Sequence, residues 1–203
     1  LNNNSEFIRF AGSTNDSTYK NLKVSFNSVD LGKLVPKVDN LNLKGIVNGN
    51  LNILQRKGLY YPSSNITIDA IDFNKTLLGN MVIDIKGNNE LTRYDLITTL
   101  TNNNIKSINS TGYIDASSDK AKIDLDIALN KFNLTTISPF GGTVISNIRG
   151  FLSGNGKVSG ELNSPNIFGD FKILNGGLNV PYLNIDYSLD PDTDLLVTRE
   201  KLE

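Results

Sequence analysis

The sequence predicts an all-β protein built from long, mostly antiparallel strands. Apolar and polar residues alternate over most of the chain, which is typical of strands with one buried and one solvated face. Clusters of Gly, Asn, Asp and Ser separate these segments and favour tight hairpins. A helical pattern is confined to 135–148, where Gly141-Gly142 interrupts it. We therefore expect about ten strands and under about a tenth of the residues in helices.

The first clear alternation covers residues 41–53. Its odd positions are Leu, Ile, Val or Gly, whereas its even positions are mostly Asn and Lys. At about 3.3 Å per residue such a strand is roughly 43 Å long, well above the usual five or six residues. Long strands favour an extended sheet.

The same pattern returns along the rest of the chain. It is clear at 121–129 and 148–162. Weaker alternation is found at 66–70, 81–85, 94–100, 167–173 and 183–189. The turn clusters that we expect between strands are 86–89, 101–104, 116–119 and 175–177.

The chain also contains an internal repeat. Segments 43–49 and 148–154 share the order apolar, basic, Gly, apolar, apolar, polar, Gly, and a Pro followed by Asn-Ile comes after each. No shift in composition marks a linker. We therefore expect one domain over residues 1–203, with a repeat at about 41–70 and 146–175.

Composition excludes several classes of function. The chain has no His and no Cys, so it cannot form a Ser-His-Asp or Cys-His catalytic set, a His/Cys zinc site or a disulfide. Its 20 Lys and Arg balance 21 Asp and Glu, without the clustered cations that nucleic acid requires. The N-terminal Leu1-Asn2 is neither an initiator Met nor part of a signal peptide, and we expect a piece of a longer chain.

We find no catalytic residues in the sequence. Asp124 and Asp126 alternate with apolar neighbours beside Lys122, so we expect them on a solvated face. Residues 190–194 alternate acids but lack the interior Gly and distal Glu of an EF-hand. The sequence predicts neither an enzyme, nor a metal site, nor a cofactor.

The apolar faces of the strands need a cover. Helices are too few to supply a second layer, which leaves a closed sandwich or barrel, a rolled sheet, or an open gutter covered by a ligand. Glycines at 150, 154, 156 and 160 fall on one apolar face, and they favour strong curvature, an open groove floor, or ordinary bulges and turns.

The C-terminal half of the chain resembles a known family. The segments that carry the resemblance are the Gly-rich run at 146–154, then Gly160-Glu161-Leu162 with Pro165 and Gly169, and then Gly176-Gly177 before Val180-Pro181-Tyr182-Leu183. This ordered string resembles the C-terminal conserved region of the TamB family of translocation and assembly module proteins. The resemblance extends over about 40–190 and is strongest over 146–187.

The resemblance implies a periplasmic protein of a diderm bacterium, anchored in the inner membrane by a segment that this chain lacks. It implies a long curled sheet, taco-like or gutter-like, with an apolar interior. The roles it implies are passage of phospholipid between the inner and outer membranes and support of outer-membrane protein assembly and secretion, together with a TamA-like barrel protein.

We therefore expect a non-enzymatic β-groove that shields phospholipid acyl chains. The alternatives are a chaperone-like module that adds a strand to outer-membrane protein clients, or a structural β-repeat of an adhesin. Open sheet edges predict self-association. The residues that we expect to line the groove are Leu41, Leu43, Val47, Leu51, Ile53, Ile123, Leu125, Ile127, Leu129, Ile148, Leu152, Val158 and Leu162.

Overall fold

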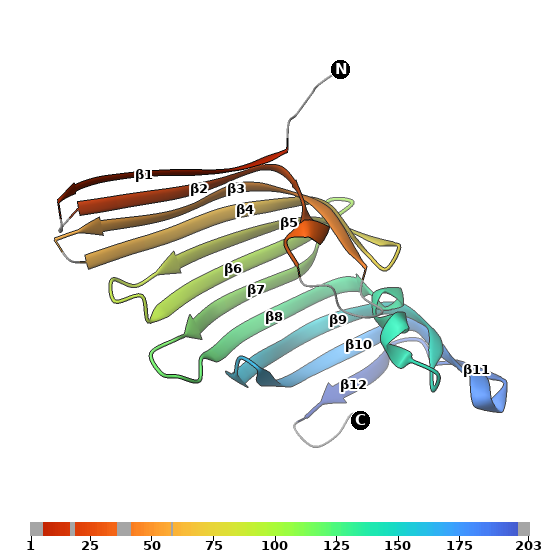
Figure 1. The fold of residues 1–203 in the computed structure, drawn as a ribbon. Helices are drawn as coiled ribbons and strands as arrows, with labels where there is room; N and C mark the ends of the chain where they lie inside the picture. The colour runs from red at the N-terminus through yellow and green to blue at the C-terminus, as the bar shows by residue number, and fades with distance from the viewer. Residues whose placement is uncertain (1–5, 17–18, 36–41, 58, 199–203) are drawn as a thin grey trace.

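A computed structural model describes residues 6–16, 19–35, 42–57 and 59–198. These residues form one twelve-stranded antiparallel sheet (Figure 1). The strands are β1 (Phe7–Asp16), β2 (Tyr19–Asp30), β3 (Leu43–Arg56), β4 (Leu59–Phe73), β5 (Thr76–Gly87), β6 (Arg93–Asn102), β7 (Ile105–Asp115), β8 (Lys122–Asn133), β9 (Ser146–Glu161), β10 (Ser164–Val180), β11 (Ile185–Ser188) and β12 (Thr193–Val197). Three short 3₁₀ helices complete the order: η1 (Leu31–Lys33), η2 (Leu134–Gly141) and η3 (Pro181–Leu183).

The sheet is a meander in which each strand from β1 to β11 pairs with its neighbour in sequence. β10 is the exception at the far edge, because β11 pairs with its C-terminal part and β12 with its middle. This topology needs only hairpins, two of which have the two consecutive positive-φ residues of a type I′ turn: Asn74-Lys75 and Asn103-Asn104. Long alternating segments joined by such turns give the all-β fold that the sequence predicts.

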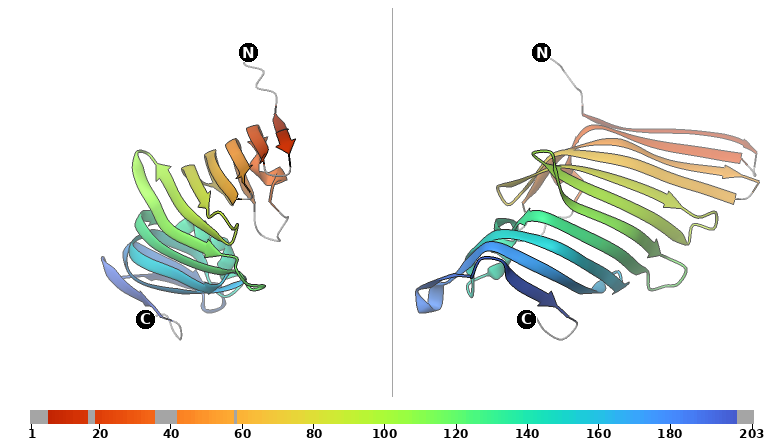
Figure 2. Two further views of the ribbon diagram at one scale, coloured as in Figure 1. Left: turned by 90° about the vertical axis from the view of Figure 1, so that its left-hand side faces the viewer. Right: turned by 180° about the vertical axis from the view of Figure 1, so that it is seen from behind.

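The predicted strong curling of the sheet into a taco-like or gutter-like groove is not found. The sheet is twisted and open, with β1 at one edge and β12 at the other (Figure 2). Twist is the ordinary consequence of right-handed strand geometry. The confirmed part of the fold is therefore a long antiparallel sheet.

The predicted turn at 175–177 is wrong. Asn175 has φ 51° and the pairing of β9 with β10 shifts between Leu174 and Gly177, so this segment is a bulge inside β10. The Arg149 guanidinium occupies the space beside Gly177, where a Cβ would lie 2.5 Å from Arg149 Cζ. Glycine at this position leaves room for an arginine and does not mark the end of the strand.

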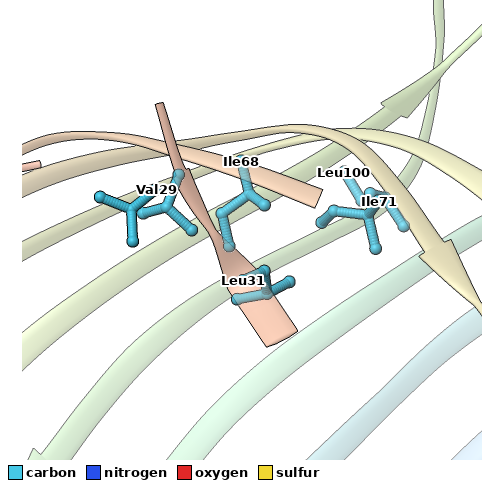
Figure 3. Packing of buried hydrophobic residues seen from close by; sticks show 6 residues of the cluster. Val29, Leu31, Ile68, Ile71 and Leu100 are labelled. Atoms are coloured by element: carbon cyan, nitrogen blue, oxygen red, sulfur yellow. The ribbon is translucent and has the colours of Figure 1, made fainter. Parts of the chain in front are cut away.

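The hydrophobic core lies at one end of the strands. Leu31 of η1 packs with Val29, Ile68, Ile71 and Leu100 on one face of the sheet (Figure 3). η1 begins at Asp30, whose carboxylate accepts a hydrogen bond from Gly32 N at 2.9 Å.

η2 lies at the same end of the strands and fulfils the prediction of one short helical segment near 135–148. Its N-cap Asn133 accepts a hydrogen bond from Thr135 N, and its Leu134 is buried. The ring of Phe140 lies 5.7 Å from that of Phe73, at the end of β4. The helical segments therefore cover the sheet at one end of its strands.

Candidate functional site: the apolar face

We call the side of the sheet that carries Val47, Ile68, Leu100 and Leu125 the apolar face, and the opposite side the polar face. Residues directly opposite each other in an antiparallel sheet share a face, so the register defines rows that cross the strands. One row, the Leu100 row, crosses from β2 to β12. Its members are Val29, Val47, Ile68, Met81, Leu100, Ile108, Leu129, Gly154, Phe171 and Leu195.

A second row, the Leu125 row, lies farther from the helical segments. Its members are Phe10, Val24, Leu51, Ser64, Ile85, Leu96, Gly112, Leu125, Val158 and Ile167. Every member is apolar, Gly or Ser, which gives an uninterrupted apolar band across ten strands. Such continuity follows from a hairpin register that keeps the period-two pattern in phase.

The two rows differ in how well they are covered. Leu100 is 1% exposed, beneath the η1 cluster, whereas in the Leu125 row Leu51 is 37% and Phe10 is 72% exposed, while Val24, Ser64 and Leu125 are buried. Two hollows lie on the apolar face. One, of about 340 Å³, lies over β3 to β7 and includes Leu51, Ile53, Pro62, Ile85, Tyr94 and Ile114. The other, of about 320 Å³, lies over β7 to β12 and includes Ile127, Leu129, Leu152, Val158, Phe171 and Leu195.

Most of the predicted lining residues lie on the apolar face. Val47 and Leu125 are buried, and Leu51 is exposed. The half-buried ones are Leu43, Ile53, Ile123, Ile127, Leu129, Leu152 and Val158. Their shared face follows from the alternation that predicted them.

Three predicted lining residues are not placed within the strand pattern of the apolar face. Leu162 is exposed in the hairpin between β9 and β10. Ile148 lies between the positive-φ residues Asn147 and Gly150, where its N–H donates to Ser138 Oγ of η2 at 3.1 Å. Simple alternation does not extend through such a bulge. Leu41 lies outside the described residues.

The sequence analysis missed several members of the apolar face. Ile68, Leu100 and Phe171 are buried in the Leu100 row but lie in strands with weaker alternation. Phe171 also explains two glycines. A Cβ at Gly156 would lie 2.7 Å from Phe171 Cζ, and one at Gly169 would lie 2.5 Å from it. These glycines make room for the Phe171 ring, and a single sequence does not reveal which large side chain a glycine accommodates.

The polar face carries the charges. Lys157 Nζ lies 2.7 Å from Asp124 Oδ1 and 3.8 Å from Asp126 Oδ1, on adjacent strands. The hydrogen bond with Asp124 raises the pKa of Lys157 above its ordinary value. Both aspartates therefore lie on the solvated face, as the alternation predicts.

Other chemistry is not evident in the part of the chain that the structure describes. It contains no group of three or more acidic side chains arranged to hold a metal ion. None of its helices is long and apolar enough to cross a bilayer. Arg149 forms the most elaborate ion pair, donating to both carboxylate oxygens of Asp186 at 2.9 and 2.8 Å, and this pair fastens β11 to the sheet.

Comparison with known proteins identifies the family. Residues 13–173 match the model described as "TamB, N-terminal domain". The chain belongs to the TamB family. The match extends from β1 to β10, which places every member of the Leu125 row except Phe10 within the matched residues. No curated protein and no solved structure matches the chain.

The prediction of family is confirmed, but the prediction that this is the C-terminal conserved region of TamB is not supported. The matching model is the N-terminal one, and it begins well before the Gly-rich string at 146–187. The ordered glycines in that string accompany strand pairing and bulges. Glycines at such positions suit any long antiparallel sheet of this kind. They therefore indicate the type of sheet but not which region of a TamB protein the chain represents.

Proposed function

We propose that this chain is a non-enzymatic periplasmic segment of a TamB-like protein whose apolar face shields phospholipid acyl chains during transport between the inner and outer membranes. The observation that supports this most directly is the Leu125 row, a band across ten strands that contains no charged side chain and lies outside the η1 cluster, with Leu51, Phe10 and Ile167 exposed. A band of this kind offers acyl chains a place outside water without specific polar contacts.

The energetics favour a lipid. Each methylene removed from water contributes about 0.8 kcal/mol, so a chain lying along the band gains affinity from length alone. Two hollows with mainly apolar linings lie on the same face, and apolar surface of this kind marks interaction sites. The finer picture, a gutter that encloses the chains, requires further curvature or neighbouring segments of the protein.

Family membership supports the cellular setting. Members of the TamB family are typically periplasmic and anchored in the inner membrane. For this chain we propose the periplasm of a diderm bacterium, anchoring in the inner membrane, a TamA-like outer-membrane barrel as partner, and support of outer-membrane protein assembly and secretion.

The alternative of a strand-adding chaperone is favoured by the β1 edge. Within the described residues, β1 pairs only with β2, and its other side is open to an incoming strand. Phe10 of β1 is 72% exposed, and a side chain on an added strand could pack beside it. The adhesin alternative requires a closed dry core, which this open sheet does not supply.

Lipid extraction and crosslinking test the proposal. We expect phospholipids to co-purify with the protein and to be identified by mass spectrometry. A phospholipid with a diazirine in the acyl chain should crosslink to peptides of the apolar face, including those that contain Leu51, Leu96 and Leu125. Crosslinking confined to the polar face, or no bound lipid, would contradict the proposal.

A further inference from the structure

A polar row lies at the end of the apolar face opposite the helical segments. Lys20, Gln55 and Tyr60 are in direct register on β2, β3 and β4. They share a face with Leu22, Ile53 and Pro62, because each lies two residues from the corresponding apolar residue along its strand. We call Lys20, Gln55 and Tyr60 the Gln55 row.

Gln55 is the unusual member of this row. It is 8% exposed, and its Oε1 is buried without a hydrogen-bond partner among the described residues. A buried acceptor left unpaired is destabilising, and native proteins rarely tolerate one without a purpose. A bound molecule could therefore supply the hydrogen-bond donor that Gln55 Oε1 lacks.

Lys20 lies directly beside this amide on the apolar face. The neighbouring strand ends also contain Lys23, Arg56, Lys57 and Lys86, but Lys23, Arg56 and Lys86 alternate with Leu22, Gln55 and Ile85 and therefore lie on the polar face. Lys20 forms no ion pair with a carboxylate of the described residues. At the ends of β6 to β9 on the same side, Arg93 pairs with Asp95 and Lys120 with Glu161. Among the cations at these strand ends, Lys20 is therefore the one in direct register with Gln55.

The composition of the face changes along the strands inward from this row. The next positions are Leu22, Ile53 and Pro62, two of which line the hollow of about 340 Å³, and the Leu125 row follows. From Ile53 to Gly49 along β3, short of the buried Val47, the distance is about 13 Å, close to the roughly 15 Å of half a bilayer hydrocarbon core. The Gln55 row therefore offers a cation, an amide and a phenol at one end of the face, and apolar residues lie beyond it. This order matches the polar headgroup and the apolar tail of a phospholipid.

We propose that the Gln55 row is a headgroup site, where Lys20 attracts the lipid phosphate and Gln55 Oε1 accepts a hydrogen bond from the headgroup, while an acyl chain lies along the apolar face. This inference rests on the proposed function and adds the polarity of the bound lipid: the head lies at the strand ends of β2 to β4 and the tail points toward η1. It also specifies the lipid class, a phospholipid whose headgroup carries a hydrogen-bond donor.

The test compares phosphatidylglycerol with phosphatidylcholine of identical acyl chains. Glycerol offers hydroxyl donors on an anionic lipid, whereas choline offers no donor. Each lipid competes with a phospholipid that carries a fluorophore in its acyl chain, and displacement from the protein gives relative affinity. We expect phosphatidylglycerol to compete better.

Two variants test whether the preference for phosphatidylglycerol arises from the Gln55 row. Lys20→Gln should weaken the binding of phosphatidylglycerol about fivefold and the binding of phosphatidylcholine less. One lysine near an anionic lipid surface changes the affinity by about that factor. Gln55→Leu should reduce the preference for phosphatidylglycerol by about two- to tenfold, the range expected for one lost hydrogen bond. Lys106→Gln is the matched control, since Lys106 is an exposed lysine at the other end of the strands, and it should bind as the parent does.

The outcomes separate the two proposals. Equal competition by the two lipids, or equal effects of Lys20→Gln and Lys106→Gln, overturns the headgroup site while acyl crosslinking to the apolar face still supports lipid shielding. Competition by glycerol 3-phosphate as strong as that of the lipid would make this an anion site unrelated to lipid. Failure of all phospholipids to bind overturns both. Circular dichroism of each variant establishes that it is folded.

Discussion

At the scale of single residues, the two ends of the apolar face have different roles. Leu100 is sealed under the η1 cluster, whereas Leu51 lies in the Leu125 row with 37% of its surface exposed. We expect Leu100→Ala to destabilise the fold by about 2–5 kcal/mol, the range for a buried leucine. Leu51→Ala should cost less than about 1 kcal/mol. Urea denaturation of both variants measures this difference, and equal costs would show that the two rows form one closed core.

Gln55 gives a stability prediction that is independent of lipid. Replacing a buried, unpaired amide by an apolar side chain of similar size removes a desolvation penalty. Gln55→Leu should therefore melt at the same temperature as the parent or higher. Differential scanning calorimetry of lipid-free protein provides the test, with Gln55→Ala as a control that also loses packing. A marked fall in the melting temperature of Gln55→Leu would mean that the amide has a partner.

At the scale of elements, β1 is the exposed edge of the sheet. It is ten residues long, and Phe7, Ile8 and Phe10 are exposed beside a single cation, Arg9. Natural edge strands avoid pairing by charges, bulges or Pro, and β1 has little of this protection. We expect concentration-dependent self-association, with Phe10→Lys reducing it. Sedimentation equilibrium of parent and variant measures the effect, and an unchanged association constant would exclude the β1 edge.

Element prediction from this sequence succeeded where period-two alternation was in phase with the register. β3, β8 and β9 follow the three clearest alternating segments, and residues such as Val47 and Leu125 lie on the expected face. It failed at 175–177, because a positive-φ Asn before Gly suits a bulge as well as a hairpin. It also passed over Gln55, because a polar residue at the end of an apolar alternation does not reveal that its amide is buried.

At the scale of the whole molecule, the sheet has a direction. Helical segments close one end of the apolar face, the Gln55 row with Lys20 lies at the other end, and apolar rows connect the two. Overall shape was harder to predict than pairing, since alternation determines which residues share a face but not how far a sheet curls. A lipid-shielding role depends on the continuity of the rows more than on closure.

The most direct test of that role is Leu125→Asp, at the centre of the Leu125 row on β8. Leu125 is 9% exposed and is flanked by Gly112 and Val158 on the adjacent strands of a single sheet. A charge there should lower the melting temperature without unfolding the sheet, because it can remain hydrated, unlike a charge in a sealed core. Ala128→Asp is the matched control, exposed on the opposite face of the same strand.

The measurement is crosslinking of the acyl-chain diazirine phospholipid to each folded variant, quantified by mass spectrometry. Acyl shielding predicts that Leu125→Asp remains folded and loses most of its crosslinked lipid while Ala128→Asp retains the parental amount. Unfolding of Leu125→Asp, or crosslinking unchanged from the parent, would contradict an apolar face that holds lipid.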